Sequence, residues 1–122
     1  MIKNDPLTEK IIACAYKVHS MLGPGFNEKI YHNALKLALK ADNLSYETEK
    51  RYEVSYEDKQ VGVLRIDLIV EDKVVVEVKA ITGMIPKIFE AQVLSYLKIT
   101  GYKVGLLINF GSKSCQIRRL MF

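Results

Sequence analysis

The chain has 122 residues, of which 49% are hydrophobic and 26% are charged, and its net charge is +4. This length suits one domain spanning residues 1–122, and the composition excludes an intrinsically disordered chain. No apolar run approaches the roughly 20 residues of a membrane span, and the polar N-terminus lacks a secretory signal, so we expect a cytoplasmic location without membrane association. Two cysteines, Cys14 and Cys115, are too few for a disulfide framework and are expected to be reduced.

Two helices are predicted in the first third of the chain. Asp5 can cap a helix whose first position is Pro6, and apolar residues then recur at helical spacing until Gly23 ends the pattern. Asn27 can cap a second helix that runs to about residue 42 with one apolar stripe. The "GPG" segment between them predicts a turn.

Three strands are predicted next, over residues 46–57, 60–70 and 73–79. The sequence "EDK" separates them twice, at 57–59 and at 71–73, and short polar segments of this kind are typical of hairpin turns. The sequence therefore predicts a three-stranded antiparallel meander.

The last third of the chain predicts a helix and two strands. Pro86 can start a helix that runs to about residue 100 and ends at Gly101. "YKVGLLINF" reads as a buried strand and "SCQIRRLMF" as a more exposed one. The element order ααβββαββ predicts an α/β or α+β fold, with helices packed on one sheet.

The strand "VVVEVK" carries charge where further apolar residues would be expected. Because side chains alternate across a strand, Val75, Glu77 and Lys79 share one face, and Val74, Val76 and Val78 share the other. The same rule, applied to the strand before it, places Asp67 with Arg65 and Ile69, opposite Leu64, Ile66, Leu68 and Val70. With the turn centred near Asp72, Asp67 should lie opposite or close to Glu77.

Two interpretations of this charged face are open. A solvated sheet face with cross-strand ion pairs would stabilise the fold by about 1 kcal/mol or less per pair. However, Asp67 and Glu77 stand between aliphatic neighbours, and two carboxylates at close range repel each other unless a cation lies between them. A hard ion such as Mg²⁺ or Mn²⁺ prefers these oxygen ligands, and the backbone carbonyl of Val78 is a further candidate. Lys79 on the same face would then orient water or offset charge on a phosphate.

Two further motifs have both an ordinary and a functional explanation. Glu28 in "GFNEKIY" stands at a helix start, where acids are favoured electrostatically. Gln92 and Tyr96 in "EAQVLSY" lie one turn apart on one helical face, which is typical of a boundary with the core. The pair could also contact phosphate or a base edge, or form hydrogen bonds to the metal-site residues.

These motifs together resemble a known family. "GPGFNEKIYHNAL", "RIDLIVEDKVVVEVKA", "EAQVLSYLKITGYKVGLLINFG" and "IRRL" are similar to the GxxExxY proteins, a small-domain branch of the PD-(D/E)XK nuclease superfamily, from about Ile11 to Arg119. "QVLSY" also resembles the Gln-x-x-x-Tyr motif of the RecB-like and lambda-exonuclease-like members. One departure is Ile66, which stands where the superfamily often has proline.

The resemblance implies a restriction-endonuclease-like core, with a mixed central sheet of about five strands flanked by helices. It implies that Asp67 and Glu77 hold the metal, that Glu28 completes the site, and that Lys79 is the catalytic lysine. Gln92 and Tyr96 would position the substrate or the attacking water. The leading hypothesis is a Mg²⁺- or Mn²⁺-dependent deoxyribonuclease, with a role in DNA repair or recombination.

Other functions remain open on the sequence alone. The domain could act as a homodimeric resolvase of Holliday junctions, or as a non-catalytic binding or scaffold domain that keeps the nuclease fold. Basic residues are candidates for contacts with the nucleic-acid backbone and would make binding sensitive to salt. They are Lys50, Arg51, Arg65, Lys87, Lys98, Lys103, Arg118 and Arg119.

Overall fold

The computed structural model describes residues 5–122, and its elements follow the predicted order. They are α1 (Pro6–Leu22), α2 (Glu28–Ala41), β1 (Tyr46–Tyr56), β2 (Lys59–Val70), β3 (Val74–Lys79), α3 (Lys87–Thr100), β4 (Val104–Asn109) and β5 (Gln116–Met121). The predicted bounds are confirmed to within three residues at each end. No helix within residues 5–122 is long and apolar enough to cross a membrane.

The five strands form one mixed sheet in the order β1-β2-β3-β4-β5. Neighbouring strands are antiparallel except β3 and β4, which are parallel because α3 forms the crossover between them. The predicted antiparallel meander of β1, β2 and β3 is confirmed.

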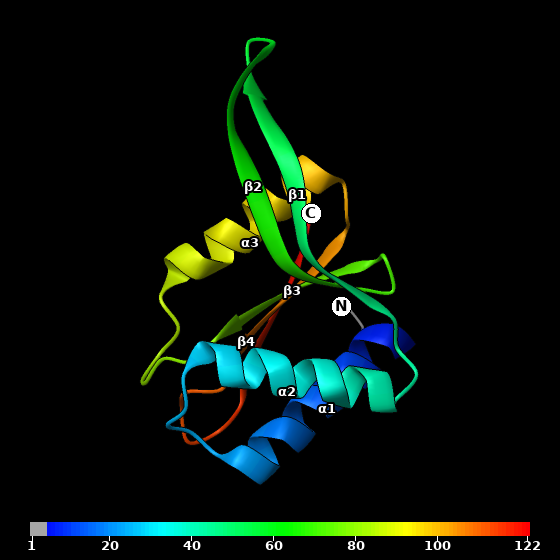
Figure 1. Ribbon diagram of the computed structural model, residues 1–122. Helices are drawn as coiled ribbons and strands as arrows, with labels where there is room; N and C mark the ends of the chain where they lie inside the picture. Colours follow the sequence, from blue (N-terminus) through cyan, green and yellow to red (C-terminus); the bar gives the residue numbers. More distant parts are fainter. Residues whose placement is uncertain (1–4) are drawn as a thin grey trace.

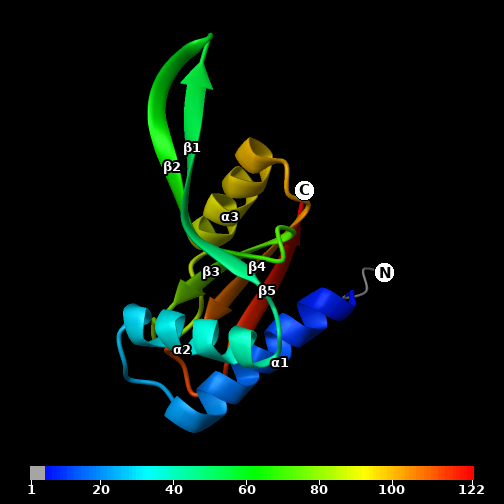
Figure 2. The same ribbon diagram turned by 45° about the vertical axis from the view of Figure 1, so that its right-hand side comes forward.

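Helices cover both faces of the sheet, as Figures 1 and 2 show. The larger apolar cluster joins α1 and α2 to the sheet through side chains such as Leu35, Val76 and Leu106, all fully buried. Two smaller clusters join α3 to the other face. Gly105 permits this close approach, because a Cβ atom there would lie 2.5 Å from Val93 Cγ1.

The β1–β2 hairpin extends well beyond the rest of the molecule (Figures 1 and 2). Its turn places two consecutive non-glycine residues, Glu57 and Asp58, at positive φ, and the β2–β3 turn does the same with Glu71 and Asp72. Such pairs are typical of the turns whose twist matches that of the flanking strands. The outer part of the hairpin is exposed on both faces, so only its base contributes to the core.

Candidate active site

Three carboxylates from three different elements converge at one end of the sheet. Glu28, Asp67 and Glu77 each offer an oxygen, and these three oxygens lie within 4.8 Å of one another. Glu28 is the first residue of α2, Asp67 lies on β2 and Glu77 on β3. The cluster therefore depends on how α2 is placed against the β2–β3 hairpin.

The strand register explains why Asp67 and Glu77 are neighbours. The last bonded pairs of β2 and β3 are Val70 with Val74, Ile69 with Val75 and Leu68 with Val76. One further step along the same register puts Asp67 opposite Glu77. The predicted proximity of these two acids is thus present in the structure, while their role as metal ligands stays a prediction.

An irregularity in β1 lies beside Asp67. Thr48 pairs with Leu68 and Lys50 with Ile66, but Glu49, which stands between them, has a φ of 54° and is not paired with Asp67. A non-glycine residue in this left-handed region is uncommon, and such residues concentrate at functional sites. The ladder is therefore interrupted at the level of the acids.

The sequence prediction for the faces of β2 is wrong for the residues that precede Asp67. Leu64 and Ile66 were expected to share the face of Leu68 and Val70, but Ile66 packs instead with Ile69 and Val75 under α3, and Leu64 packs against the same cluster. Strict alternation fails at Asp67, the residue of β2 whose pairing with the left-handed Glu49 of β1 is missing.

Glu28 is presented by a loop that a buried tyrosine holds in place. The Tyr31 hydroxyl donates to the Gly23 carbonyl at 2.5 Å and accepts from the Phe26 amide at 3.2 Å, and the ring stacks on Phe110 with centroids 4.9 Å apart. Asn27 caps the helix by accepting from the Ile30 amide at 3.1 Å. The glycines, the acid and the tyrosine of "GPGFNEKIY" therefore act together, because Tyr31 fixes the loop that sets the position of Glu28.

The environment of Glu77 favours its protonated form. Its side chain is 8% exposed, and burial raises its pKa to about 7, assisted by the negative charges of Asp67 and Glu28 and opposed by Lys79. Three carboxylates at this distance repel one another unless a proton or a cation is shared between them. Hard oxygen donors and concentrated negative charge fit a divalent ion such as Mg²⁺ or Mn²⁺.

Lys79 lies on the same face as Glu77, two residues further along β3. Its ammonium nitrogen is 3.7 Å from Glu77 Oε1 and 4.3 Å from the centre of the Phe89 ring on α3. Its side chain is 16% exposed, so the charge is held near the acids rather than free in solvent. Val78 points the other way into the core, and only its backbone is available to the site.

Gln92 and Tyr96 are both half-buried on α3. Tyr96 packs against the Ile66–Ile69–Val75–Leu97 cluster, and burial raises its pKa, with further contributions from Glu77 and Asp67. Its phenol is thus electrostatically linked to the acids. The positioning role predicted for Gln92 and Tyr96 stays a prediction.

Asn109, a fully buried polar residue at the end of β4, was not among the residues predicted from the sequence. It pairs with Lys79 in the parallel ladder, accepts from the Ile81 amide at 2.9 Å and donates to the Ile81 carbonyl at 2.9 Å. Asn109 therefore fixes the chain directly after the lysine. An asparagine at the end of an otherwise apolar strand was the available signal.

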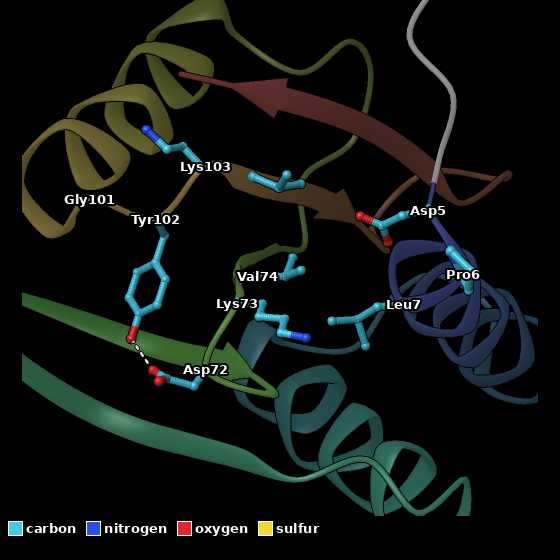
Figure 3. A pocket seen from close by; sticks show the side chains of 10 residues that line it. Asp5, Pro6, Leu7, Asp72, Lys73, Val74, Gly101, Tyr102 and Lys103 are labelled. Atoms are coloured by element: carbon cyan, nitrogen blue, oxygen red, sulfur yellow. Dashed lines mark hydrogen bonds between the residues drawn. The ribbon is translucent and has the colours of Figure 1, made fainter.

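Two of the hollows among the described residues lie on different parts of the molecule. One, of about 550 Å³, is a groove between α2 and the base of the β1–β2 hairpin, and Glu28 and Asp67 line it. The other, of about 610 Å³, lies where β3 and β4 begin and is bounded by the start of α1 (Figure 3). In the second hollow the Tyr102 hydroxyl donates to the Asp72 carboxylate. Two of the three clustered acids, Glu28 and Asp67, thus open onto the first hollow.

Comparison with known proteins identifies a family. The family model of the PD-(D/E)XK nuclease superfamily matches residues 5–120, which is nearly the whole chain. The search of curated proteins and the search of solved structures returned no match. The mixed sheet and the order ααβββαββ agree with a restriction-endonuclease-like fold.

Proposed function

This chain belongs to the PD-(D/E)XK nuclease superfamily, and we propose that it is a Mg²⁺- or Mn²⁺-dependent nuclease that hydrolyses phosphodiester bonds in DNA. Within the superfamily we assign it to the GxxExxY proteins, near the RecB-like and lambda-exonuclease-like members, with a role in DNA repair or recombination. The observation that carries the proposal is the convergence of Glu28, Asp67 and Glu77 beside Lys79.

We assign a role to each group from its position. Glu28, Asp67 and Glu77 hold the cation, with the Val78 carbonyl as a further ligand. A bound divalent cation supplies Lewis acidity, which lowers the pKa of water and offsets charge on a phosphate. Lys79 holds its positive charge beside Glu77 and stabilises the negative charge that builds up on the phosphate oxygens during hydrolysis. Gln92 and Tyr96 orient the substrate from α3.

Not every basic residue named as a candidate for backbone contacts is equally available. Arg119 is largely buried and lies 3.9 Å from Asp5, and Lys50 pairs with Glu47 at 3.0 Å. Arg65 lies 3.5 Å from Asp67 and 3.8 Å from Glu49, which places its guanidinium beside the acids. Of these three, Arg65 is therefore the best placed to contact a substrate.

The test is cleavage of single-stranded and duplex DNA with Mn²⁺ and with EDTA. We expect cleavage that EDTA abolishes and that Asp67→Ala or Lys79→Ala reduces by at least about 100-fold, since the first removes a ligand of the cation and the second removes a positive charge beside the reacting phosphate. Glu53→Ala is the matched control, because Glu53 is an exposed acid on β1 outside the cluster. Cleavage that persists in EDTA, or that both variants leave unchanged, rejects the mechanism.

The same assay separates the other functions. Symmetric cutting of a four-way junction by a homodimer indicates a junction resolvase. Salt-sensitive DNA binding without cleavage under any metal condition indicates a non-catalytic binding domain.

A further inference from the structure

The groove between α2 and the base of the β1–β2 hairpin leads directly to Glu28 and Asp67, and the basic residues of its α2 wall have no role in the assignments above. Its α2 wall carries Lys29, His32 and Lys36, and its other wall carries Arg65. We propose that this groove binds the sugar–phosphate backbone of one nucleic-acid strand and guides it to the acids. This inference rests on the proposed nuclease function and names the residues that bind its substrate.

The spacing on α2 suits a run of phosphates. Residues 29, 32 and 36 are three and four positions apart, so they lie along one face of the helix, directly after Glu28. Seven residues of helix span about 10 Å, so Lys29 and Lys36 can contact different phosphates of one strand. The basic track therefore begins at the acids and continues away from them for two turns.

The polar groups of this track lack partners in the described part of the chain. Among residues 5–122, neither Lys29 nor Lys36 forms an ion pair, although Lys36 is half-buried. The Nε2 atom of His32 is buried without a hydrogen-bond partner, which is uncommon for a polar atom in a folded protein. An anion in the groove would supply partners to Lys29 and Lys36, whose ammonium groups form no ion pair among the described residues.

The size and charge of the surroundings favour a single strand. A groove of about 550 Å³ has the capacity of a small-molecule site and takes a strand segment rather than a whole duplex. The outer hairpin, from residues 52 to 63, carries Glu53, Glu57 and Asp58 against one lysine, Lys59. Its negative charge repels phosphates, which confines the strand to the α2 side.

Binding of the strand should depend on the cation. Three acids and three bases line the groove, so its charge is balanced when no cation is bound; the acids are Glu28, Glu49 and Asp67, and the bases are Lys29, Lys36 and Arg65. A divalent ion on Glu28 and Asp67 would neutralise two of the acids and weaken the hold of Asp67 on Arg65. The groove then becomes positive, and its affinity for a polyanion rises.

The experiment measures fluorescence anisotropy of labelled single-stranded and blunt duplex oligodeoxynucleotides. Ca²⁺ serves as the probe cation because it takes the same oxygen ligands, and gels verify that the DNA stays intact. For the double variant Lys29→Glu with Lys36→Glu, we expect at least tenfold weaker binding of the single strand. We also expect a salt slope reduced by about 1.4, since each lost phosphate contact removes about 0.7 from the slope for a single strand. Wild-type affinity should rise when Ca²⁺ replaces EDTA.

The matched control is Lys10→Glu with Lys17→Glu. Lys10 and Lys17 have the same spacing as Lys29 and Lys36, are exposed and lie on α1, so this double variant makes the same change in net charge away from the groove. Equal losses of affinity in both double variants, or none in either, overturn the proposal. Tighter binding of the blunt duplex than of the single strand also overturns it. Circular dichroism confirms folding, and Lys29→Ala with Lys36→Ala repeats the test without new acids.

Failure of this inference is distinguishable from failure of the nuclease assignment. If the wild type cleaves DNA with Mn²⁺ and the Lys29–Lys36 variants cleave it equally well, the groove proposal is wrong and the nuclease proposal is unaffected. If the wild type does not cleave DNA but binds the single strand, and these variants lose that binding, the groove proposal is supported and the nuclease proposal is wrong.

Discussion

β3 has six residues, three on each face, and its two faces differ in polarity and burial. Val74, Val76 and Val78 face α1 and α2 and are almost fully buried in the larger apolar cluster. Val75, Glu77 and Lys79 face α3, and this face becomes charged after Val75. One face therefore positions the strand, while the other carries the groups capable of chemistry.

The difference follows from the neighbours of the strand. Up to Val75 the second face is covered by Leu97 of α3 and by Ile69 of β2. Beyond it the β2–β3 ladder ends, and the acids meet the start of α2 at the groove. The charged end is thus tolerated because the opposite face supplies the packing that holds the strand.

The largest effect is expected from placing charge on the apolar face. Val76→Asp buries a carboxylate among apolar side chains without a partner, and we expect it to lower the free energy of unfolding by at least about 4 kcal/mol. Urea denaturation followed by circular dichroism measures this loss. Glu77→Gln, one residue away on the other face, should remain folded; equal destabilisation by both would contradict the contrast between the faces.

A large effect on activity without loss of folding is expected from Lys79→Met, which keeps the length of the side chain but removes its charge. We expect the rate of DNA cleavage with Mn²⁺ to fall by at least about 100-fold, because the charge beside Glu77 is lost. Lys10→Met, at an exposed position on α1 away from the groove, is the control. Wild-type rates in the Lys79 variant would show that its charge has no part in catalysis.

The pKa of Glu77 predicts how metal-free stability depends on pH. Because this pKa is about 7 in the folded protein and 4.5 ordinarily, the native carboxyl keeps a proton that the unfolded chain releases. The stability it contributes is complete below about pH 4.5 and is lost as pH rises through 7, by at most about 3 kcal/mol.

The measurement compares urea denaturation of the wild type and of Glu77→Gln in EDTA, near pH 5 and near pH 8. The difference between the two proteins should change over this interval, since the glutamine cannot titrate. Added Mn²⁺ should restore wild-type stability near pH 8. A difference independent of pH would mean that Glu77 is ionised throughout.

The smallest effect is expected from Phe89→Leu. This change removes the ring that lies 4.3 Å from the Lys79 ammonium, and we expect cation–π stabilisation of about 0.5–1 kcal/mol to be lost. Thermal or urea denaturation measures it, with Ile88→Ala, at an exposed neighbour, as the control. If Lys79→Met abolishes the effect of Phe89→Leu in a double-mutant cycle, the contact is its cause.

The sequence predicted the element order and the proximity of Asp67 to Glu77, because turn residues and alternation act locally. The predicted faces of Leu64 and Ile66 on β2 were wrong. The left-handed Glu49 on β1 interrupts the pairing beside them, and no feature of the composition indicates that conformation. The sequence prediction also missed the groove, because Lys29 and Lys36 read as ordinary exposed helix residues until α2 is placed beside the hairpin. What local rules could not supply was the packing between elements.

The most direct test of the account is calorimetric titration of the metal-free protein with Mn²⁺ near pH 8. We expect one ion per chain, with binding greatly weakened by Asp67→Asn or Glu77→Gln and unaffected by Glu53→Gln on the exposed hairpin, because only the first two remove a carboxylate from the cluster. Absence of binding, or binding that all three variants retain, would contradict the assignment of these acids as a metal site.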